Sequence, residues 1–334
     1  MNKSYVLGIV FTFFFAGVTQ AEPITLNTGT ETFTGLLLEG SGTPNVGVIF
    51  FHGRGGNPDG DVVGQLRQSL NADGYTTLSI ANPVPSSGIT TFSEYLANES
   101  IIQSQIFAYF NAAVDELVNR NNNIDTIVIG GFSLGSRFAT ATAAALNQGL
   151  FGMNPNVTLA GLLGVGMPST IGGTDPSTST NINIYDTINN LGLVSPSIPV
   201  LDLFGDGDTD AASNALNRLN AFQGMDYTQV VLGCPDFSGT TFYTLNEAGT
   251  SAIVYTENNC HQLRNAYPTA NDALNDTNIS VTLRGSADAP LESNVSDWFA
   301  AYVPLTPIPV PPSIWLFGSG LVWLVGASKR KKVA

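Results

Sequence analysis

Lysine is almost absent from this 334-residue chain, and none occurs between residues 22 and 304. The same stretch contains seven arginines against all 26 acidic residues, which gives it a formal charge of −19. A surface with so few cations cannot neutralise rows of phosphate groups. We therefore expect neither nucleic acid nor an anionic membrane surface as a partner of this stretch.

The chain also lacks the sequence patterns of several cofactor-dependent classes. It has no cluster of metal-ligating residues, no glycine-rich phosphate loop and no nicotinamide-binding fingerprint, so we expect neither a metal nor a cofactor. No internal repeat with a period of about 20 to 50 residues is visible, which argues against a solenoid. With 43% hydrophobic residues the chain can bury a core and is not intrinsically disordered.

Cysteine is scarce, and Cys234 and Cys260 are the two in the chain. We expect them to form a disulfide if the protein is exported, because the periplasm and the cell exterior are oxidising. Such a bond would constrain the unfolded chain by about 3 kcal/mol in the entropy model. It would also restrain the next residue, His261. Two buried free thiols are the alternative.

The first 21 residues have the pattern of a secretory signal peptide. Lys3 precedes an apolar run, and Thr19, Gln20 and Ala21 follow it, which is typical of a segment cleaved after residue 21. An uncleaved N-terminal anchor is the alternative, but the run is short for a membrane span.

The other end, residues 304–334, joins a proline-rich spacer, an apolar stretch from Ile314 to Ala327 and a basic cluster at 329–332. The apolar stretch would make a helix of about 21 Å, shorter than a bilayer core of about 30 Å. This tail resembles the PEP-CTERM sorting signals that exosortases process in Gram-negative bacteria, although residues 309–311 read Pro-Val-Pro where Pro-Glu-Pro is usual. The resemblance implies export to the periplasm, cell surface or extracellular matrix, with membrane attachment through the tail before processing. An ordinary C-terminal anchor helix is the alternative.

Between these ends, in residues 22–303, short apolar runs alternate with helical patterns, which predicts one doubly wound α/β domain with a mostly parallel sheet. The expected buried strands are 46–51, 75–80, 126–129, 158–166, 200–204 and 252–255, with an early antiparallel strand at 33–38. The expected helices are 61–71, 99–119, 134–147 and 211–222. The polar stretches 169–197 and 233–250 are too long for tight connections, and they are expected either as lids or as surface loops.

The most informative motif follows the run Ile127 to Ile129, which breaks into Gly-Gly-Phe-Ser-Leu-Gly at residues 130–135. This is the G-x-S-x-G pattern of a nucleophile elbow, in which a serine stands on a sharp strand-to-helix turn. Glycine is expected at 131 and 135 because larger side chains would collide across the turn. Ser133 is thus the candidate nucleophile, and a glycine-rich turn without chemistry is the simpler interpretation.

A serine nucleophile needs a base to take its proton, and the chain offers two histidines. His52 ends a predicted strand in the H-G-x-x-G pattern of an oxyanion loop, where it is expected to shape the loop. His261 follows the last predicted strand, and it is the candidate base. A surface or packed histidine without a catalytic role is the alternative.

An acidic turn follows the predicted strand 200–204. A carboxylate must hold the imidazole of such a base in its productive tautomer. Asp208 is the first candidate for this role and Asp206 the second, whereas Asp202 lies mid-strand and is expected to face a helix. Asp206, Asp208 and Asp210 could instead bind a cation, but the segment fails the EF-hand template at its sixth and twelfth positions.

The motifs FFHGRGG, GGFSLGS, LDLFGDGD and NNCHQL, in this order, resemble exported bacterial proteins of the α/β-hydrolase family across residues 30–303. The resemblance implies that Ser133 is the nucleophile, His261 the base and Asp208 its partner. It also implies an oxyanion hole formed by the backbone N–H groups of Arg54 and Leu134. The Arg54 side chain could receive an acidic group of the substrate, or it could be an ordinary exposed charge.

These features predict an exported serine hydrolase, most simply a carboxylic-ester hydrolase that acts through an acyl-enzyme. Its substrate would lie outside the cytoplasm, and acyl groups on extracellular polysaccharide are one hypothesis, suggested by the tail. A peptidase or a lipase would use the same residues, although the absence of a long apolar lid argues against a lipase. The alternative from another class is an inactive α/β-hydrolase scaffold that serves as a surface or matrix protein.

Overall fold

The computed structural model describes residues 21–41, 44–83, 97–168, 182–232, 243–245, 252–254, 261, 271 and 291–305. Almost all of the predicted signal segment (1–21) and tail (304–334) lies outside these residues, and so do Cys234 and Cys260. Signal cleavage, membrane attachment and the disulfide therefore stay predictions. Within the described ranges, no helix is both long enough and apolar enough to cross a membrane.

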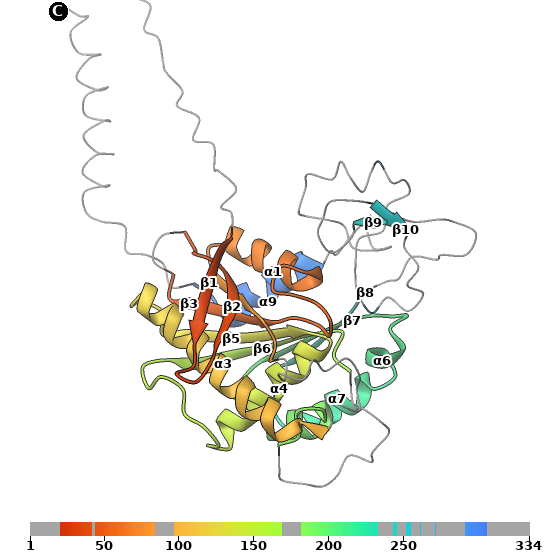
Figure 1. Ribbon diagram of the computed structural model, residues 1–334. Coiled ribbons are helices and arrows are strands. Elements are labelled where there is room, and N and C mark those ends of the chain that lie inside the picture. Colours follow the sequence, from red (N-terminus) through yellow and green to blue (C-terminus); the bar gives the residue numbers. More distant parts are fainter. Residues whose placement is uncertain are drawn as a thin grey trace, which may run out of the picture.

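Eight of the described strands form one sheet in the order β1-β2-β4-β3-β5-β6-β7-β8 (Figure 1). Their bounds are β1 Glu22–Asn27, β2 Thr32–Leu38, β3 Val46–Phe51, β4 Thr76–Ile80, β5 Thr126–Phe132, β6 Thr158–Val165, β7 Val200–Gly205 and β8 Tyr227–Leu232. The hairpin β1–β2 is antiparallel, whereas the strands from β4 across to β8 run parallel to one another. The predicted doubly wound, mostly parallel sheet of the α/β-hydrolase type is confirmed.

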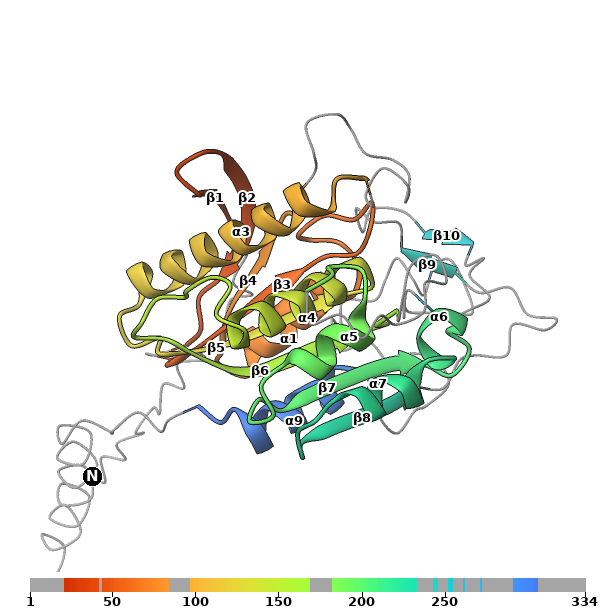
Figure 2. The same cartoon turned by 90° about the horizontal axis from the view of Figure 1, so that it is seen from below.

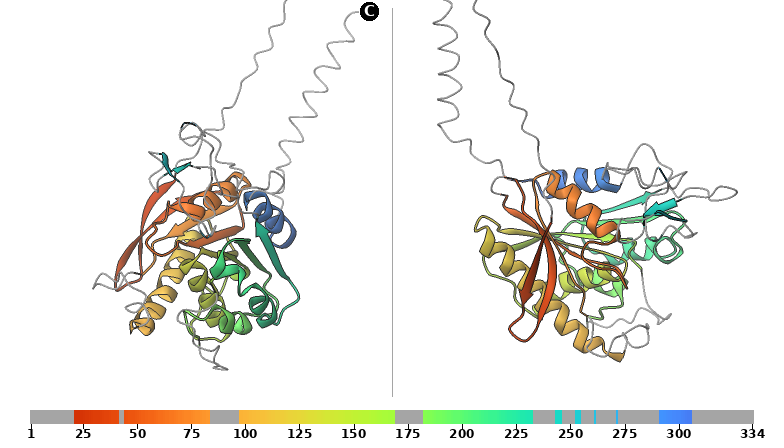
Figure 3. Two further views of the ribbon diagram at one scale, coloured as in Figure 1. Left: turned by 90° about the vertical axis from the view of Figure 1, so that its right-hand side faces the viewer. Right: turned by 45° about the horizontal axis from the view of Figure 1, so that its top comes forward.

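Helices cover both faces of the sheet, because its central strands are apolar on both sides. Successive side chains of a strand point to opposite faces, so Val48 and Phe50 of β3 join one core cluster and Ile49 and Phe51 join the other. The first cluster includes α1 and α9, and the second includes α3, α4 and α5 (Figure 2 and Figure 3). The bounds of these helices are α1 Asp61–Ala72, α3 Glu99–Arg120, α4 Leu134–Asn147, α5 Thr187–Leu193 and α9 Leu291–Tyr302.

The prediction of a buried parallel strand at 252–255 is wrong. Ala252–Val254 forms β10, which pairs antiparallel with β9 (Tyr243–Leu245) in a separate two-stranded ribbon (Figure 1). Val254 is 52% exposed, so it is not a core position. The last parallel strand is β8 instead. Its pattern escapes prediction because most of its residues are only half-buried at the edge of the sheet.

The single helix predicted at 211–222 is in fact two helices, α6 (Thr209–Ala212) and α7 (Ala215–Ala221). The break falls at Ser213 and Asn214. Side chains of these two types can hydrogen-bond to nearby backbone groups, so they favour turns and helix caps over helix interiors.

The polar stretch 169–197 contributes to the core in the part that the structure describes. Ile184 and Leu191 are fully buried, and α5 packs against α4. Residues 182–197 are therefore not a lid. Residues 169–181 and most of 233–250 lie outside the described residues, so both readings of those segments stay open.

The order of the strands indicates where a ligand would bind. From β3 the chain passes through α1 to β4 on one side, whereas β5 lies on the other side of β3. In open α/β sheets, ligands bind outside the carboxyl ends of the strands at such a switch point. The register pairs Phe51 of β3 with Gly131 of β5, so the loops after these two strands begin side by side.

Glu292 should make the stability of the fold depend on pH. It is 7% exposed, and in the described part of the chain its carboxylate has no hydrogen-bond donor beyond its own backbone N–H. Burial raises the pKa of Glu292 from 4.5 to about 7. Between these values the folded state binds more protons than the unfolded state, so the free energy of unfolding falls as the pH rises, by on the order of 3 kcal/mol. We expect Glu292→Gln to remove most of this decrease in the free energy of unfolding with rising pH.

Urea unfolding at about pH 5 and at about pH 7.5 measures the effect, because these values bracket the window. Asp297→Asn is the matched control, since Asp297 is exposed on the same helix. It should keep the pH dependence of the wild type. Equal pH dependence in Glu292→Gln and the wild type would contradict the prediction.

Candidate active site

The turn after β5 has the strained backbone that a nucleophile elbow requires. Ser133 has φ 53° and ψ −114°, and among the described residues it is the one residue other than glycine with a positive φ. Such a conformation costs about 1–3 kcal/mol, so surrounding contacts must hold it. The Ser133 N–H donates to the Val165 carbonyl at 2.9 Å, and the Ser133 carbonyl accepts from the Ser136 N–H and hydroxyl at 3.1 and 2.6 Å.

The two glycines of the motif allow α4 to begin directly against the strands. A Cβ atom at Gly131 would overlap the backbone of Gly135, and a Cβ atom at Gly135 would overlap the carbonyl oxygen of Phe51. A side chain at Gly131 would push the helix away from β5, and one at Gly135 would push it away from the end of β3. The prediction that larger side chains collide across this turn is confirmed.

His261 and Asp208 complete a hydrogen-bonded chain to the serine. His261 Nε2 lies 2.8 Å from Ser133 Oγ, and His261 Nδ1 lies 2.8 Å from Asp208 Oδ2. Because the carboxylate can only accept, Nδ1 carries a proton and Nε2 of the neutral ring is left to accept the serine proton. The structure thus joins the three predicted residues, which come from separate parts of the chain, in the geometry of a nucleophile, a base and an orienting acid.

The three residues of this hydrogen-bonded chain differ in how far they are exposed to solvent. The Asp208 side chain is fully buried, the His261 side chain is 18% exposed, and Ser133 is partly exposed. The Phe132 ring packs beside the imidazole with a centroid distance of 5.5 Å. The carboxylate is therefore shielded from water, while the two residues that would carry out proton transfer lie nearer the surface.

Asp208 is held by its own backbone as well as by the imidazole. Its Oδ1 atom accepts from the N–H groups of Asp210 and Ala211, both at 3.1 Å, and so caps α6. Both oxygens are engaged in holding the loop and the ring, which disfavours the cation site considered for this turn. Asp206 is exposed, and its N–H donates to the Leu232 carbonyl, so the second candidate acid lies outside the chain of hydrogen bonds.

Asp202 faces α7 from the middle of β7, as predicted. Its Oδ2 atom accepts from Arg218 Nε at 2.9 Å, and both side chains are fully buried. The Tyr227 hydroxyl and the Gln229 amide donate to the same oxygen, at 3.0 and 2.9 Å. This carboxylate ties two strands and a helix together and has no contact with the triad.

The predicted oxyanion loop follows β3. Gly56 donates its N–H to the Gly53 carbonyl at 3.2 Å, which closes a turn around Arg54, and the Arg54 side chain is exposed. Leu134 is the first residue of α4, so its N–H has no carbonyl partner within the helix. His52 lies at the start of this loop. Its Nδ1 atom hydrogen-bonds to the Gly53 carbonyl at 2.7 Å.

Two buried residues near the site carry no sequence signal. Asn82, just after β4, hydrogen-bonds to His52, and Arg137 of α4 donates to the Tyr185 carbonyl. Burial lowers the pKa of Arg137 to about 10, an effect that nearby Asp186 and Asp210 partly offset. Neither residue belongs to a motif, because each acts through tertiary contacts that sequence spacing does not show.

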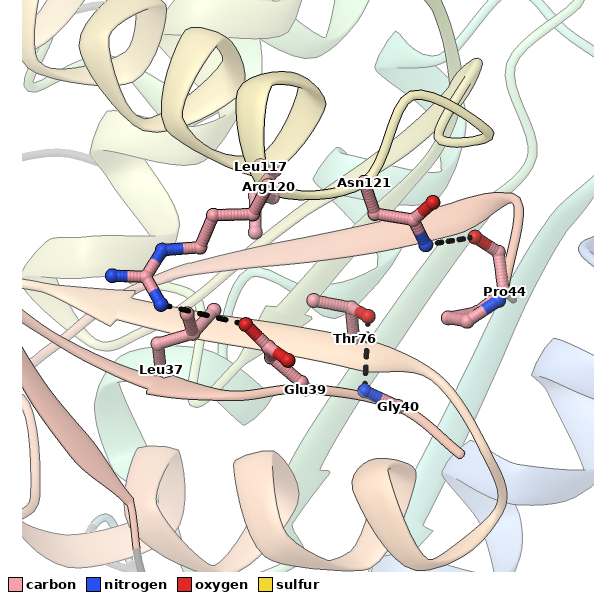
Figure 4. Close-up of a pocket in the computed structure, with 8 residues that line it drawn as sticks. All are labelled: Leu37, Glu39, Gly40, Pro44, Thr76, Leu117, Arg120 and Asn121. Atoms are coloured by element: carbon pink, nitrogen blue, oxygen red, sulfur yellow. Dashed lines mark hydrogen bonds and ion pairs between the residues drawn. The ribbon is translucent and has the colours of Figure 1, made fainter. Parts of the chain in front are cut away.

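A cavity of about 250 Å³ lies at the other end of the strands from the triad, near the amino ends of β3 and β4 (Figure 4). It is lined by Leu37, Glu39, Gly40, Pro44, Thr76, Leu117, Arg120 and Asn121. Its main cation is already engaged, since Arg120 pairs with three carboxylates. None of the residues that line this cavity belongs to the triad or to the loop after β3, so the cavity is separate from the candidate active site.

Two parallel Asp→Asn substitutions should separate folding from chemistry. Asp202→Asn leaves buried Arg218 without its counter-charge, so we expect the free energy of unfolding to fall by about 3 kcal/mol. The reactivity of Ser133 should be unchanged in folded molecules. Asp208→Asn keeps a residue that caps helices well but no longer favours the productive imidazole tautomer. We expect it to lower the reactivity of Ser133 by on the order of 10³-fold or more, with little effect on stability.

Urea unfolding and the rate of reaction with a serine-directed phosphonate measure the two properties separately. Each variant serves as the control for the other. The assignment of Asp208 fails if Asp202→Asn is the variant that loses reactivity while remaining folded.

No protein-family model and no curated protein matches the chain. Solved structures with a similar fold include an α/β serine hydrolase without a lid from Xanthomonas campestris, with 16% identity over 65% of this chain and 85% of that one and a TM-score of 0.46. A dienelactone hydrolase from Anabaena variabilis has 15% identity over 85% and 98% of the two chains, with a TM-score of 0.47. The esterase domain of a Rhodothermus marinus protein has 15% identity over 85% and 100%, with a TM-score of 0.49. At identities of 15–16% these likenesses concern the fold.

Proposed function

We propose that this protein is a serine hydrolase that cleaves carboxylic esters through an acyl-enzyme on Ser133. The observation that carries the proposal is the hydrogen-bonded chain from Ser133 through His261 to Asp208, with both distances at 2.8 Å. A strained serine backed by an imidazole and a buried carboxylate is the arrangement that activates a hydroxyl for acyl transfer.

In the first half of the reaction, the Ser133 hydroxyl passes its proton to His261 Nε2 while Oγ bonds to the ester carbonyl carbon. The carbonyl oxygen becomes negative, and the N–H groups of Arg54 and Leu134 would stabilise it, each donor by about 3 kcal/mol. Asp208 stays ionised and stabilises the imidazolium. The proton then passes from Nε2 to the alcohol oxygen as the ester C–O bond breaks, which leaves the acyl group on the serine.

In the second half, water takes the place of the alcohol. His261 Nε2 accepts a proton from this water molecule while the water oxygen bonds to the acyl carbon. The same proton returns to Ser133 Oγ as the bond between the serine and the acyl group breaks, so the carboxylic acid leaves and the enzyme is restored.

The proposal extends to location. The signal-like N-terminus and the PEP-CTERM-like tail support an exported protein that is attached to the membrane by its tail, at least until an exosortase-type protease removes it. An exported esterase needs an acylated substrate outside the cytoplasm, for which acyl groups on extracellular polysaccharide are a candidate.

Labelling of the purified protein with a fluorophosphonate probe tests the chemistry. We expect wild-type protein to be labelled covalently, Ser133→Ala to show no labelling, and His261→Ala to react about 10²–10⁴-fold more slowly because its base is gone. Ser104→Ala is the matched control, because Ser104 is an exposed serine on α3 that hydrogen-bonds only locally, to the Ile101 carbonyl. It should be labelled like the wild type.

Folded wild-type protein that resists the probe would favour the inactive scaffold over the hydrolase. If labelling succeeds, esters of increasing acyl length and a set of peptides then separate an esterase from a lipase and a peptidase. Hydrolysis of peptides faster than of any ester would overturn the ester assignment while leaving the triad intact.

Mass spectrometry of the protein isolated from its native cells tests the location. We expect the mature N-terminus at Glu22 and loss of the C-terminal segment after the proline-rich spacer. A C-terminus intact to Ala334 would mean a permanent anchor. An N-terminus that still carries the first 21 residues would contradict signal cleavage.

A further inference from the structure

Asn82 forms a clamp on the loop that follows β3. Its backbone N–H donates to His52 Nε2 at 3.0 Å, and its side-chain amide donates to the His52 carbonyl at 2.7 Å. The clamp is almost closed to water, since His52 is 8% exposed and Asn82 is 6% exposed. It joins the ends of two neighbouring parallel strands, in which Phe51 of β3 is paired with Ile80 of β4.

The partners of His52 define the state of its ring. A carbonyl can only accept, so the bond to Gly53 requires a proton on Nδ1. A backbone N–H can only donate, so the bond from Asn82 requires a lone pair on Nε2. The imidazole is therefore neutral and in the Nδ1–H tautomer. In this tautomer its two nitrogens connect the end of β4 to the first peptide of the loop.

The clamped residue lies directly against the nucleophile elbow. A Cβ atom at Gly135 would lie 2.6 Å from the His52 carbonyl oxygen, the same oxygen that accepts from the Asn82 side chain. A Cβ atom at Gly53 would lie 2.9 Å from the ring of Phe132, the neighbour of Ser133. Any shift of His52 therefore moves the peptide chain that leads to Arg54 relative to the serine.

We infer that Asn82 is a positioning residue for the oxyanion hole, acting through His52 to hold the Arg54 N–H at the distance that a negatively charged carbonyl oxygen requires. The inference rests on the proposed serine-hydrolase function and adds to it a residue outside the triad and its motifs. Oxyanion donors act only when they are held at hydrogen-bond distance from the oxygen of the transition state. A small displacement of the loop should thus slow the reaction without changing how the substrate binds.

The orientation of the Asn82 amide supports a positioning role. Its Oδ1 atom is buried and has no hydrogen-bond partner among the described residues. Leaving such an acceptor unpaired is unfavourable. Turning the amide over would place Oδ1 against the His52 carbonyl, oxygen against oxygen, and would break the clamp. The donor is therefore the functional half of this side chain.

Substitutions at Asn82 test the inference through kcat and KM. Asn82→Ala keeps the backbone bond to Nε2 but loses the side-chain donor, and we expect kcat to fall by about 10- to 100-fold with KM nearly unchanged. Asn82→Asp keeps the volume but puts a carboxylate oxygen against the His52 carbonyl, so its loss should be at least as large. A packing role would instead leave Asn82→Asp close to the wild type.

Asn121→Ala is the matched control at the opposite end of β3. The Asn121 side chain donates to the Pro44 carbonyl at 3.0 Å, just before β3 begins (Figure 4). This variant loses the same kind of bond next to the same strand, together with two bonds that Asn121 Oδ1 accepts from Asn123. The unfolding midpoint should therefore drop at least as much as in Asn82→Ala, but kcat should stay at the wild-type value. Affinity for a trifluoromethyl ketone, which forms an oxyanion on Ser133, should fall in the Asn82 variants by the same factor as kcat/KM.

The outcomes separate the two proposals. If wild-type protein reacts with neither the phosphonate nor an ester, the hydrolase function fails, and the inference fails with it. If the wild type reacts and the Asn82 variants keep its kcat and ketone affinity, only the positioning role is overturned.

The tautomer of His52 can be measured without a substrate. The chain has two histidines, and ¹⁵N spectra of the wild type should show a neutral Nδ1–H ring for His52. An Nε2–H ring there would contradict the clamp.

Discussion

The site depends on one close approach, the contact of the first turn of α4 with the end of β3. No side chain fits at Gly135, because a Cβ atom there would meet the carbonyl oxygens of Phe51 and His52. With the helix this close, the chain has no room for a gradual turn after β5, and Ser133 takes a positive φ. The same approach brings the start of the helix, including the N–H group of Leu134, next to the loop after β3. Nucleophile and oxyanion donors are thus positioned by one backbone contact between the start of α4 and the end of β3.

The acid and the base are held by a different principle. Asp208 caps α6 with one carboxylate oxygen and accepts from His261 with the other, so its own loop orients it before the imidazole is added. His261 belongs to no strand of the main sheet. In the described part of the chain, its ring is located by Asp208, by the serine and by the Phe132 side chain. The imidazole is therefore held by side chains that lie far from it in the sequence.

Most of the central fold could be predicted from the sequence because the buried parallel strands are continuous apolar runs, and β3 has the predicted bounds. The edges could not: β8 is half-buried, and the apolar run of β10 lies in a small ribbon outside the sheet. In the site, Ser133 and its glycines belong to a local motif, so spacing was enough to find them. Asp208 and His261 followed from their place after strands, even though one of those strands was assigned to the wrong sheet. Asn82 gives no such signal, because its partner is 30 residues away and is reached through a strand pairing.

The shortage of cations has a structural counterpart. Of the five arginines in the described residues, three (Arg67, Arg137 and Arg218) are buried, and Arg120 is surrounded by three carboxylates. These arginines join elements of the fold, as Arg218 joins α7 to β7. The exposed surface is left with acidic groups in excess, and a field of one sign keeps copies of a protein apart in solution and repels anionic polymers. A substrate of the proposed enzyme would therefore have to be recognised by shape and by hydrogen bonds at the oxyanion loop, because general electrostatic attraction would favour only a cation. The rigidity of that loop, and with it the clamp between Asn82 and His52, then matters more than it would on a surface that draws its substrate in by charge.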